Sequence, residues 1–101
     1  MPALRPIFDS VKTPSEGQSL EAIEGIIDAL HEAYSVVHRV DMPMYIQVQL
    51  IAALCNLQTS YCAGFENQHH VSTKYHIMAQ AQWIMFQELL KNEGIHCRVL
   101  Q

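Results

Sequence analysis

The sequence predicts an all-α fold. About 50% of its 101 residues are hydrophobic, and only four glycines and four prolines interrupt the chain. The long runs between them leave little room for the regular turns of an all-β protein. Apolar residues instead recur at alternating steps of three and four, which is the spacing of a packed helix face. We therefore expect one helical domain over 19–101, with three antiparallel helices, and an N-terminal arm over 1–18.

The arm contains three of the four prolines and shows no apolar period. Its apolar residues Ile7, Phe8 and Val11 can dock in a groove of the domain, so we expect partial order rather than a free coil. The arm also lacks the apolar core and small-residue cleavage site of a secretory signal.

The first helix is expected to begin after Ser19, a favourable N-cap residue, and to end near Arg39 or Val40. Asp41 is a cap residue, and Pro43 is tolerated only in the first turn of the next helix. The apolar stripe of this helix consists of Leu20, Ile23, Ile27, Leu30, Tyr34 and Val37.

The second helix is expected from Pro43 to about Gly64, within a run that has no charged residue between Asp41 and Glu66. Its apolar arc is wider than one helix contact needs, so we expect neighbours on two sides. One side carries Val48, Ile51, Ala52, Cys55, Cys62 and Phe65, and the neighbouring side carries Leu50, Leu54, Leu57 and Tyr61.

The third helix is expected to start at Ser72 or Thr73 and to end at Gly94 in a glycine C-cap. Two apolar rows follow it: Tyr75, Met78, Met85 and Leu89, and beside them Ala79, Trp83, Phe86 and Leu90. The alternating tail over 95–100 predicts a short extended segment.

Composition argues against several functions. The net charge is -4, and the six Lys and Arg residues are scattered, so we expect no direct nucleic-acid binding. Gln47, Gln49, Asn56 and Gln58 make the uncharged run expensive in hydrocarbon, so we expect no membrane span. Three cysteines without an export signal are typical of free thiols in a reducing cytoplasm, with Cys55 and Cys62 buried.

Histidines are the candidates for a metal site, because the chain has six. Asp28 with His31, and Glu66 with His69, follow the carboxylate-x-x-His pattern of di-iron bundles. Such sites need four inward carboxylates, which these helices do not supply, so we expect no metal and no cofactor. His69, His70 and His76 remain the alternative ligand set. No catalytic motif is present, and we expect a non-enzymatic protein.

An acidic row follows one side of the first helix: Glu21, Glu24, Asp28 and Glu32. Like charges four residues apart cost about 0.2 to 0.5 kcal/mol per pair in an isolated helix. A solvated face is the favoured interpretation, and contact with a basic surface of another protein is the alternative.

The second and third helices carry more methionine and aromatic side chains than a core of three helices can shield from water. This excess favours a homodimer or a protein complex. The predicted interface consists of Val48, Ile51, Leu54, Cys55, Leu57, Tyr61, Tyr75, Met78, Trp83 and Phe86.

In size, acidity and helical make-up over roughly 20–93, the chain resembles small bacterial or phage regulators such as quorum-sensing anti-activators. The resemblance implies a cytoplasmic regulator that binds and inhibits a larger protein, for example a transcription factor. The alternative is a helical dimer that binds a metal or small ligand through His69, His70 and His76. A structural subunit of a larger assembly is a third hypothesis.

Overall fold

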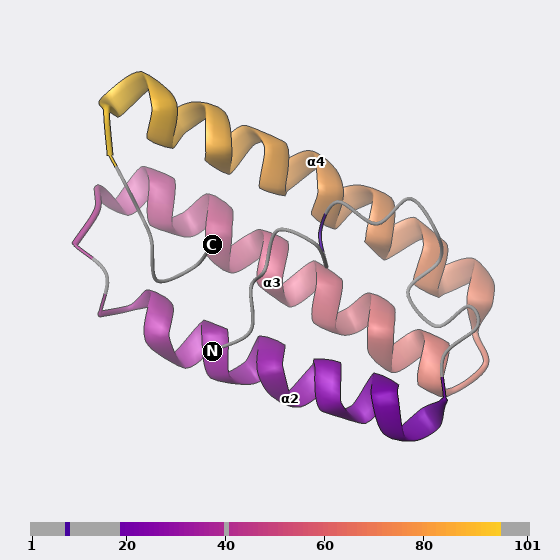
Figure 1. Ribbon diagram of the computed structural model, residues 1–101. Coiled ribbons are helices and arrows are strands. Elements are labelled where there is room, and N and C mark those ends of the chain that lie inside the picture. The colour runs from indigo at the N-terminus through magenta and orange to yellow at the C-terminus, as the bar shows by residue number, and fades with distance from the viewer. Residues whose placement is uncertain (1–7, 9–18, 40, 96–101) are drawn as a thin grey trace.

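The computed structural model describes residues 8, 19–39 and 41–95. These residues form three helices, α2 (Leu20–Val37), α3 (Met44–Phe65) and α4 (His69–Glu93), and no strand (Figure 1). The predicted all-α class with three helices is confirmed. The expected extended tail over 95–100 lies outside the described residues except for Ile95, as does all of the arm over 1–18 except Phe8.

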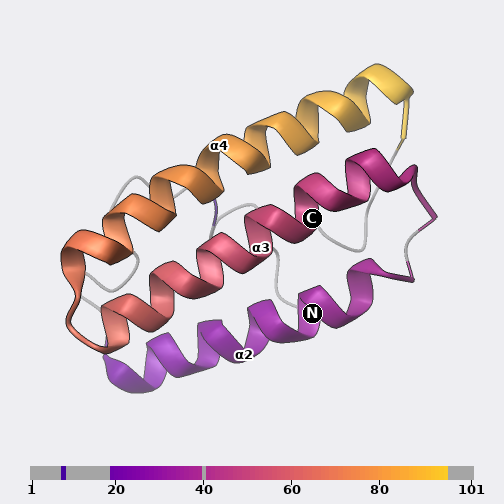
Figure 2. The same cartoon turned by 180° about the vertical axis from the view of Figure 1, so that it is seen from behind.

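The three helices lie side by side with α3 in the middle, in the front view and from behind (Figures 1 and 2). α3 packs along both α2 and α4. This position accounts for the apolar flanks of α3, since a helix with two neighbours needs an apolar flank toward each of them.

The core of the molecule lies along one face of α3. Its buried row advances in steps of four and three residues: Ile46, Leu50, Ala53, Leu57, Ser60 and Gly64. α2 adds Ile23, Leu30, Ala33 and Val37 to the core, and α4 adds Ser72, His76, Ala79, Trp83, Phe86 and Leu90. The opposite side of α3 faces solvent, and there Val48, Cys55 and Cys62 are exposed.

The expectation that Cys55 and Cys62 are buried thiols is therefore wrong. On a helix of 3.6 residues per turn, Cys55 points away from Leu57, about which the buried arc is centred. α2 and α4 contact the two flanks of that arc. The side of α3 opposite Leu57, which includes Cys55 and Cys62, is therefore exposed to solvent.

α2 begins as predicted. Ser19 Oγ accepts a hydrogen bond from the Ala22 amide at 3.1 Å, which satisfies one free donor of the first turn. The helix ends at Val37, slightly before the expected Arg39 or Val40. Within its stripe, Leu20 and Tyr34 are exposed.

α4 begins at His69, so the predicted start at Ser72 or Thr73 is wrong. Asn67 adopts a left-handed conformation with φ 62°, and the Gln68 amide donates to the Ala63 carbonyl at 2.8 Å. α4 thus begins with the polar residues His69 and His70, which add nothing to the apolar period of the helix. Gly94 ends the helix with φ 67°, as the C-cap prediction required.

Polar side chains fix the helices relative to one another. Gln47 Nε2 donates to the Val37 carbonyl at 2.8 Å, at the end of α2. Asn56 Nδ2 donates to Gln82 Oε1 at 2.7 Å, between α3 and α4. Gln47 and Asn56, two of the amides in the uncharged run, thus find partners on the neighbouring helices.

Two further contacts join α3 to α4. Ser60 Oγ donates to the Ser72 carbonyl at 2.6 Å inside the core. Near the other end, the Tyr45 hydroxyl donates to Glu93 Oε1. Tyr45 belongs to the first turn of α3, and Glu93 is the last residue of α4.

Phe8 is fully buried and stacks on Trp83, with ring centroids 4.4 Å apart and planes 3° from parallel. The expected docking of arm residues on the helical domain holds for Phe8, while Ile7 and Val11 lie outside the described residues.

Among the helices in the described part of the chain, none is long and apolar enough to cross a membrane.

Candidate functional site

The outer side of α4 carries an exposed apolar surface. The exposed fractions are 61% for Ile77, 41% for Met78, 59% for Ile84 and 52% for Met85. Ala81 is exposed between them. We call these five residues the α4 stripe. It lies opposite the buried row that contains Trp83 and holds no charged residue between Lys74 and Glu88.

A second exposed apolar surface begins at the start of α3. Met44 is 75% exposed, and Tyr45 and Val48 are each 51% exposed. We call these three residues the α3 patch. Farther along the same solvent-facing side, Cys55, Thr59 and Cys62 are also exposed, and the side remains uncharged up to Glu66.

Tyr45 is tied to α4 by its hydrogen bond to Glu93. That hydrogen bond favours the protonated phenol and raises the pKa of Tyr45 above its ordinary value of 10.0. The ring of Tyr45 adds apolar area to the α3 patch.

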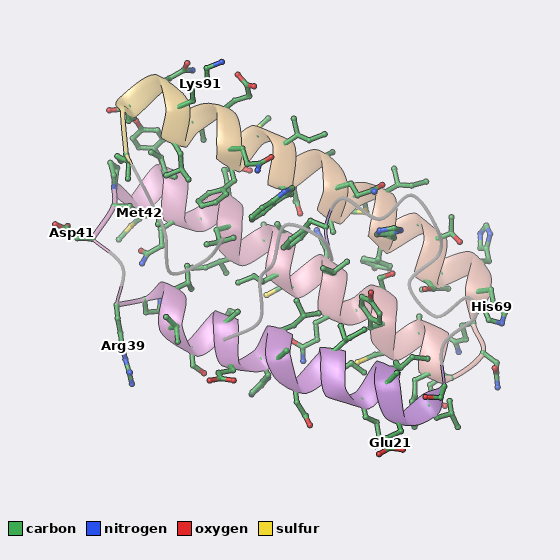
Figure 3. All side chains as sticks on the ribbon, in the orientation of Figure 1. Glu21, Arg39, Asp41, Met42, His69 and Lys91 are labelled. Atoms are coloured by element: carbon green, nitrogen blue, oxygen red, sulfur yellow. The ribbon has the colours of Figure 1, made fainter. Side chains whose placement is uncertain are left out.

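Charged side chains lie at the edges and ends of the molecule. Figure 3 shows Glu21 and Lys91 extending away from α3 on opposite outer edges, with Arg39 and Asp41 near the link between α2 and α3. The predicted acidic face is exposed to solvent at Glu21, Glu24, Asp28 and Glu32.

The residues of the predicted interface divide into two groups. Buried in the core of the chain are Leu54, Leu57, Tyr61, Trp83 and Phe86. Exposed or partly exposed are Val48, Ile51, Cys55, Tyr75 and Met78. An acidic substitution at Leu54 or Trp83 would consequently disrupt folding, and only the second group is available to a partner.

Several exposed residues were absent from that predicted interface: Met44, Tyr45, Ile77, Ile84 and Met85. The signal in the sequence is the seven-residue spacing from Ile77 to Ile84 and from Met78 to Met85, centred on Ala81. This spacing marks a face of α4 that cannot share the core with Trp83.

His69, His70 and His76, the alternative ligand set, differ in their exposure to solvent. His69 and His70 are exposed in the first turn of α4, whereas His76 is only 3% exposed. Within the part of the chain that the structure describes, His76 Nε2 has no hydrogen-bond partner, and burial lowers the pKa of the imidazole. Over the described ranges, no group of three or more His, Cys, Asp or Glu residues could hold a metal ion.

A small hollow of about 330 Å³ lies beside the stacked rings and is lined by Phe8, Gln80, Trp83 and Ile84. These four lining residues carry no charge and no nucleophile, so they supply no chemistry for catalysis. The hollow borders the α4 stripe at Ile84.

Comparison with protein-family models, with curated proteins and with solved structures found no match for this chain.

Proposed function

We propose that the protein is a non-enzymatic regulator that works by contact with a larger protein, and that the α3 patch is its contact surface. The supporting observation is the exposure of Met44, Tyr45 and Val48 on the uncharged side of the central helix. Methionine and aromatic side chains are enriched at protein interfaces, and contiguous exposed apolar surface is characteristic of binding sites.

The anti-activator type of regulator, which inhibits a transcription factor in the cytoplasm, agrees with the small size and net charge of -4. The acidic face of α2 would steer such a protein toward a basic partner, because complementary charge raises the association rate.

We also infer that each helix runs antiparallel to the helix that follows it in the chain. The hydrogen bonds of Gln47 with Val37, of Tyr45 with Glu93 and of Ser60 with Ser72 support this order. It places the α3 patch beside the end of α4.

Site-specific photocrosslinking tests the proposal. A photoreactive phenylalanine analogue replaces Val48, and the full chain is illuminated in an extract of the cells that encode it. We expect an adduct heavier than twice the 11.5 kDa chain, which would identify contact with a different and larger protein.

The control carries the same analogue at Lys91, an exposed position on the outer edge of α4 (Figure 3). The control should give no such adduct. Equal labelling from both positions, or no heavy adduct from Val48, would contradict the assignment of the α3 patch.

A further inference from the structure

The α4 stripe is symmetric about Ala81. Ile77 and Met78 lie four and three residues before Ala81, and Ile84 and Met85 lie three and four residues after it. The symmetry extends to the charges that bound the stripe, because Lys74 and Glu88 each lie seven residues from Ala81. The two charges have opposite sign.

We propose that the α4 stripe binds the α4 stripe of a second copy of this chain, with the two helices antiparallel about a twofold axis at Ala81. The inference rests on the proposed function in one respect: the α3 patch remains free to bind the larger partner, because the α4 stripe forms the contact between the two copies.

A twofold axis makes the contact reciprocal, so residue i meets residue j while j meets i. A residue that precedes Ala81 by a given rise then lies level with one that follows Ala81 by the same rise. On the helical wheel, Ile77 and Ile84 lie on one side of Ala81, and Met78 and Met85 lie on the other. Ile77 therefore meets Ile84 of the second copy, and Met78 meets Met85 of the second copy, each pair within one residue's rise of being level. The apolar stripe is complementary to itself.

The charges favour this orientation. Lys74 lies about 10.5 Å from Ala81 along the axis, level with Glu88 of the second copy, and the reciprocal pair forms at the other end. A parallel pair would instead place each lysine against lysine and each glutamate against glutamate. Both side chains are exposed, and no ion pair joins either of them to another residue within the described part of the chain.

Ala81 suits the centre of such a contact because a small side chain lets two helices approach to roughly 8 Å between axes. A single helix pair buries less than the roughly 800 Å² per partner of a standard interface. We therefore expect a dimer with a dissociation constant on the order of micromolar, which exchanges subunits readily.

A charge-exchange experiment on the full chain tests the pairing. Sedimentation equilibrium gives the dissociation constants of the wild type, Lys74→Glu, Glu88→Lys and the double variant. Each single substitution turns both attractive pairs into repulsive ones and should weaken the dimer roughly tenfold. The double variant restores opposite charges at both ends and should return to the wild-type value.

Mixing the two single variants gives a sharper result. One variant then carries glutamate at both positions and the other carries lysine at both, so a heterodimer has two attractive pairs. Native mass spectrometry should show heterodimer in excess over either homodimer, and the excess should decrease at high salt because exposed charges are screened.

Lys91→Glu is the matched control, because it makes the same charge change on an exposed residue of α4 outside the stripe. It should leave dimerisation unchanged. Circular dichroism verifies that every variant remains helical.

Two results would overturn the inference: a wild type that stays monomeric up to about 100 µM, or single variants that dimerise like the wild type without preferring each other. The Val48 crosslink to a larger protein would persist in both cases if the proposed function holds, so the two proposals fail separately.

Discussion

At the scale of single residues, His76 is the chemically unusual group of the core. Its imidazole is buried, and among the described residues Nε2 finds no hydrogen-bond partner. Burial disfavours the charged form and lowers the pKa below the ordinary value of 6.5. The folded protein therefore holds His76 neutral at pH values where the unfolded chain already binds a proton.

The sign of the resulting pH dependence follows from proton linkage. Below the unfolded pKa of about 6.5, the unfolded state binds more protons than the folded state, so acid favours unfolding. The contribution of His76 to stability is complete above that pKa and is lost as the pH falls through the lowered folded pKa.

We predict that His76→Leu reduces the loss of stability between about pH 7.5 and 5.5. Urea unfolding of both proteins at the two pH values measures the difference. His70→Gln, at an exposed histidine of the same helix, should keep the wild-type pH dependence. An unchanged loss in His76→Leu would refute the prediction.

At the scale of helices, the end of α4 illustrates how local sequence sets a boundary. Gly94 takes a left-handed conformation with φ 67°, and its amide donates to the carbonyls of the last turn. Side chains disfavour this conformation, so glycine is the usual choice. Gly25 instead lies within α2, where glycine costs conformational entropy and no left-handed residue is needed.

These two glycines give a matched prediction, because an added Cβ would meet nothing within 4 Å at either position. Gly94→Ala should destabilise the protein by about 1 to 2 kcal/mol through backbone strain. Gly25→Ala should stabilise it by about 0.5 to 1 kcal/mol. Thermal unfolding should show shifts of opposite sign, and shifts of the same sign would contradict the backbone explanation.

The start of α4 is a helix boundary that the local sequence predicted wrongly. Ser72 looked like an N-cap, yet it lies inside the helix and accepts a buried hydrogen bond from Ser60 at its carbonyl. Ser72 therefore contributes to the contact between α3 and α4 and does not cap the helix. Asn67 adopts a left-handed conformation in the link before α4. Asparagine adopts this conformation more often than most residues, but its presence in a sequence does not by itself predict it.

At the scale of the whole molecule, Phe8 links the N-terminal part of the chain to α4. Its ring stacks on Trp83, which also packs against Phe86 with centroids 5.5 Å apart. Phe8 thus joins a core that the three helices otherwise build among themselves.

We predict that Phe8→Ala destabilises the protein by about 3 to 5 kcal/mol, from lost burial and the cavity left behind. Phe8→Leu, which keeps most of the buried volume, should cost less. Urea unfolding measures both, and Trp83, the single tryptophan of the chain, reports the loss of stacking through its fluorescence. Equal stability of Phe8→Ala and wild type would show that the arm residue contributes nothing to the core.

The fold class and the cap residues Ser19 and Gly94 follow from the sequence alone. They depend on residues close together in the chain, where helix periodicity and backbone preference operate.

The functional surface depends on the tertiary structure. Periodicity showed that α3 has a wide apolar arc, but it could not tell that the Leu57 side is covered and the Val48 side is open. In α4 it likewise did not separate Met78, which is exposed, from Trp83 and Phe86, which are buried, although all three were predicted to form one interface. Which apolar face is buried is decided by the positions of neighbouring helices, since each helix can bury only the arc that another element covers.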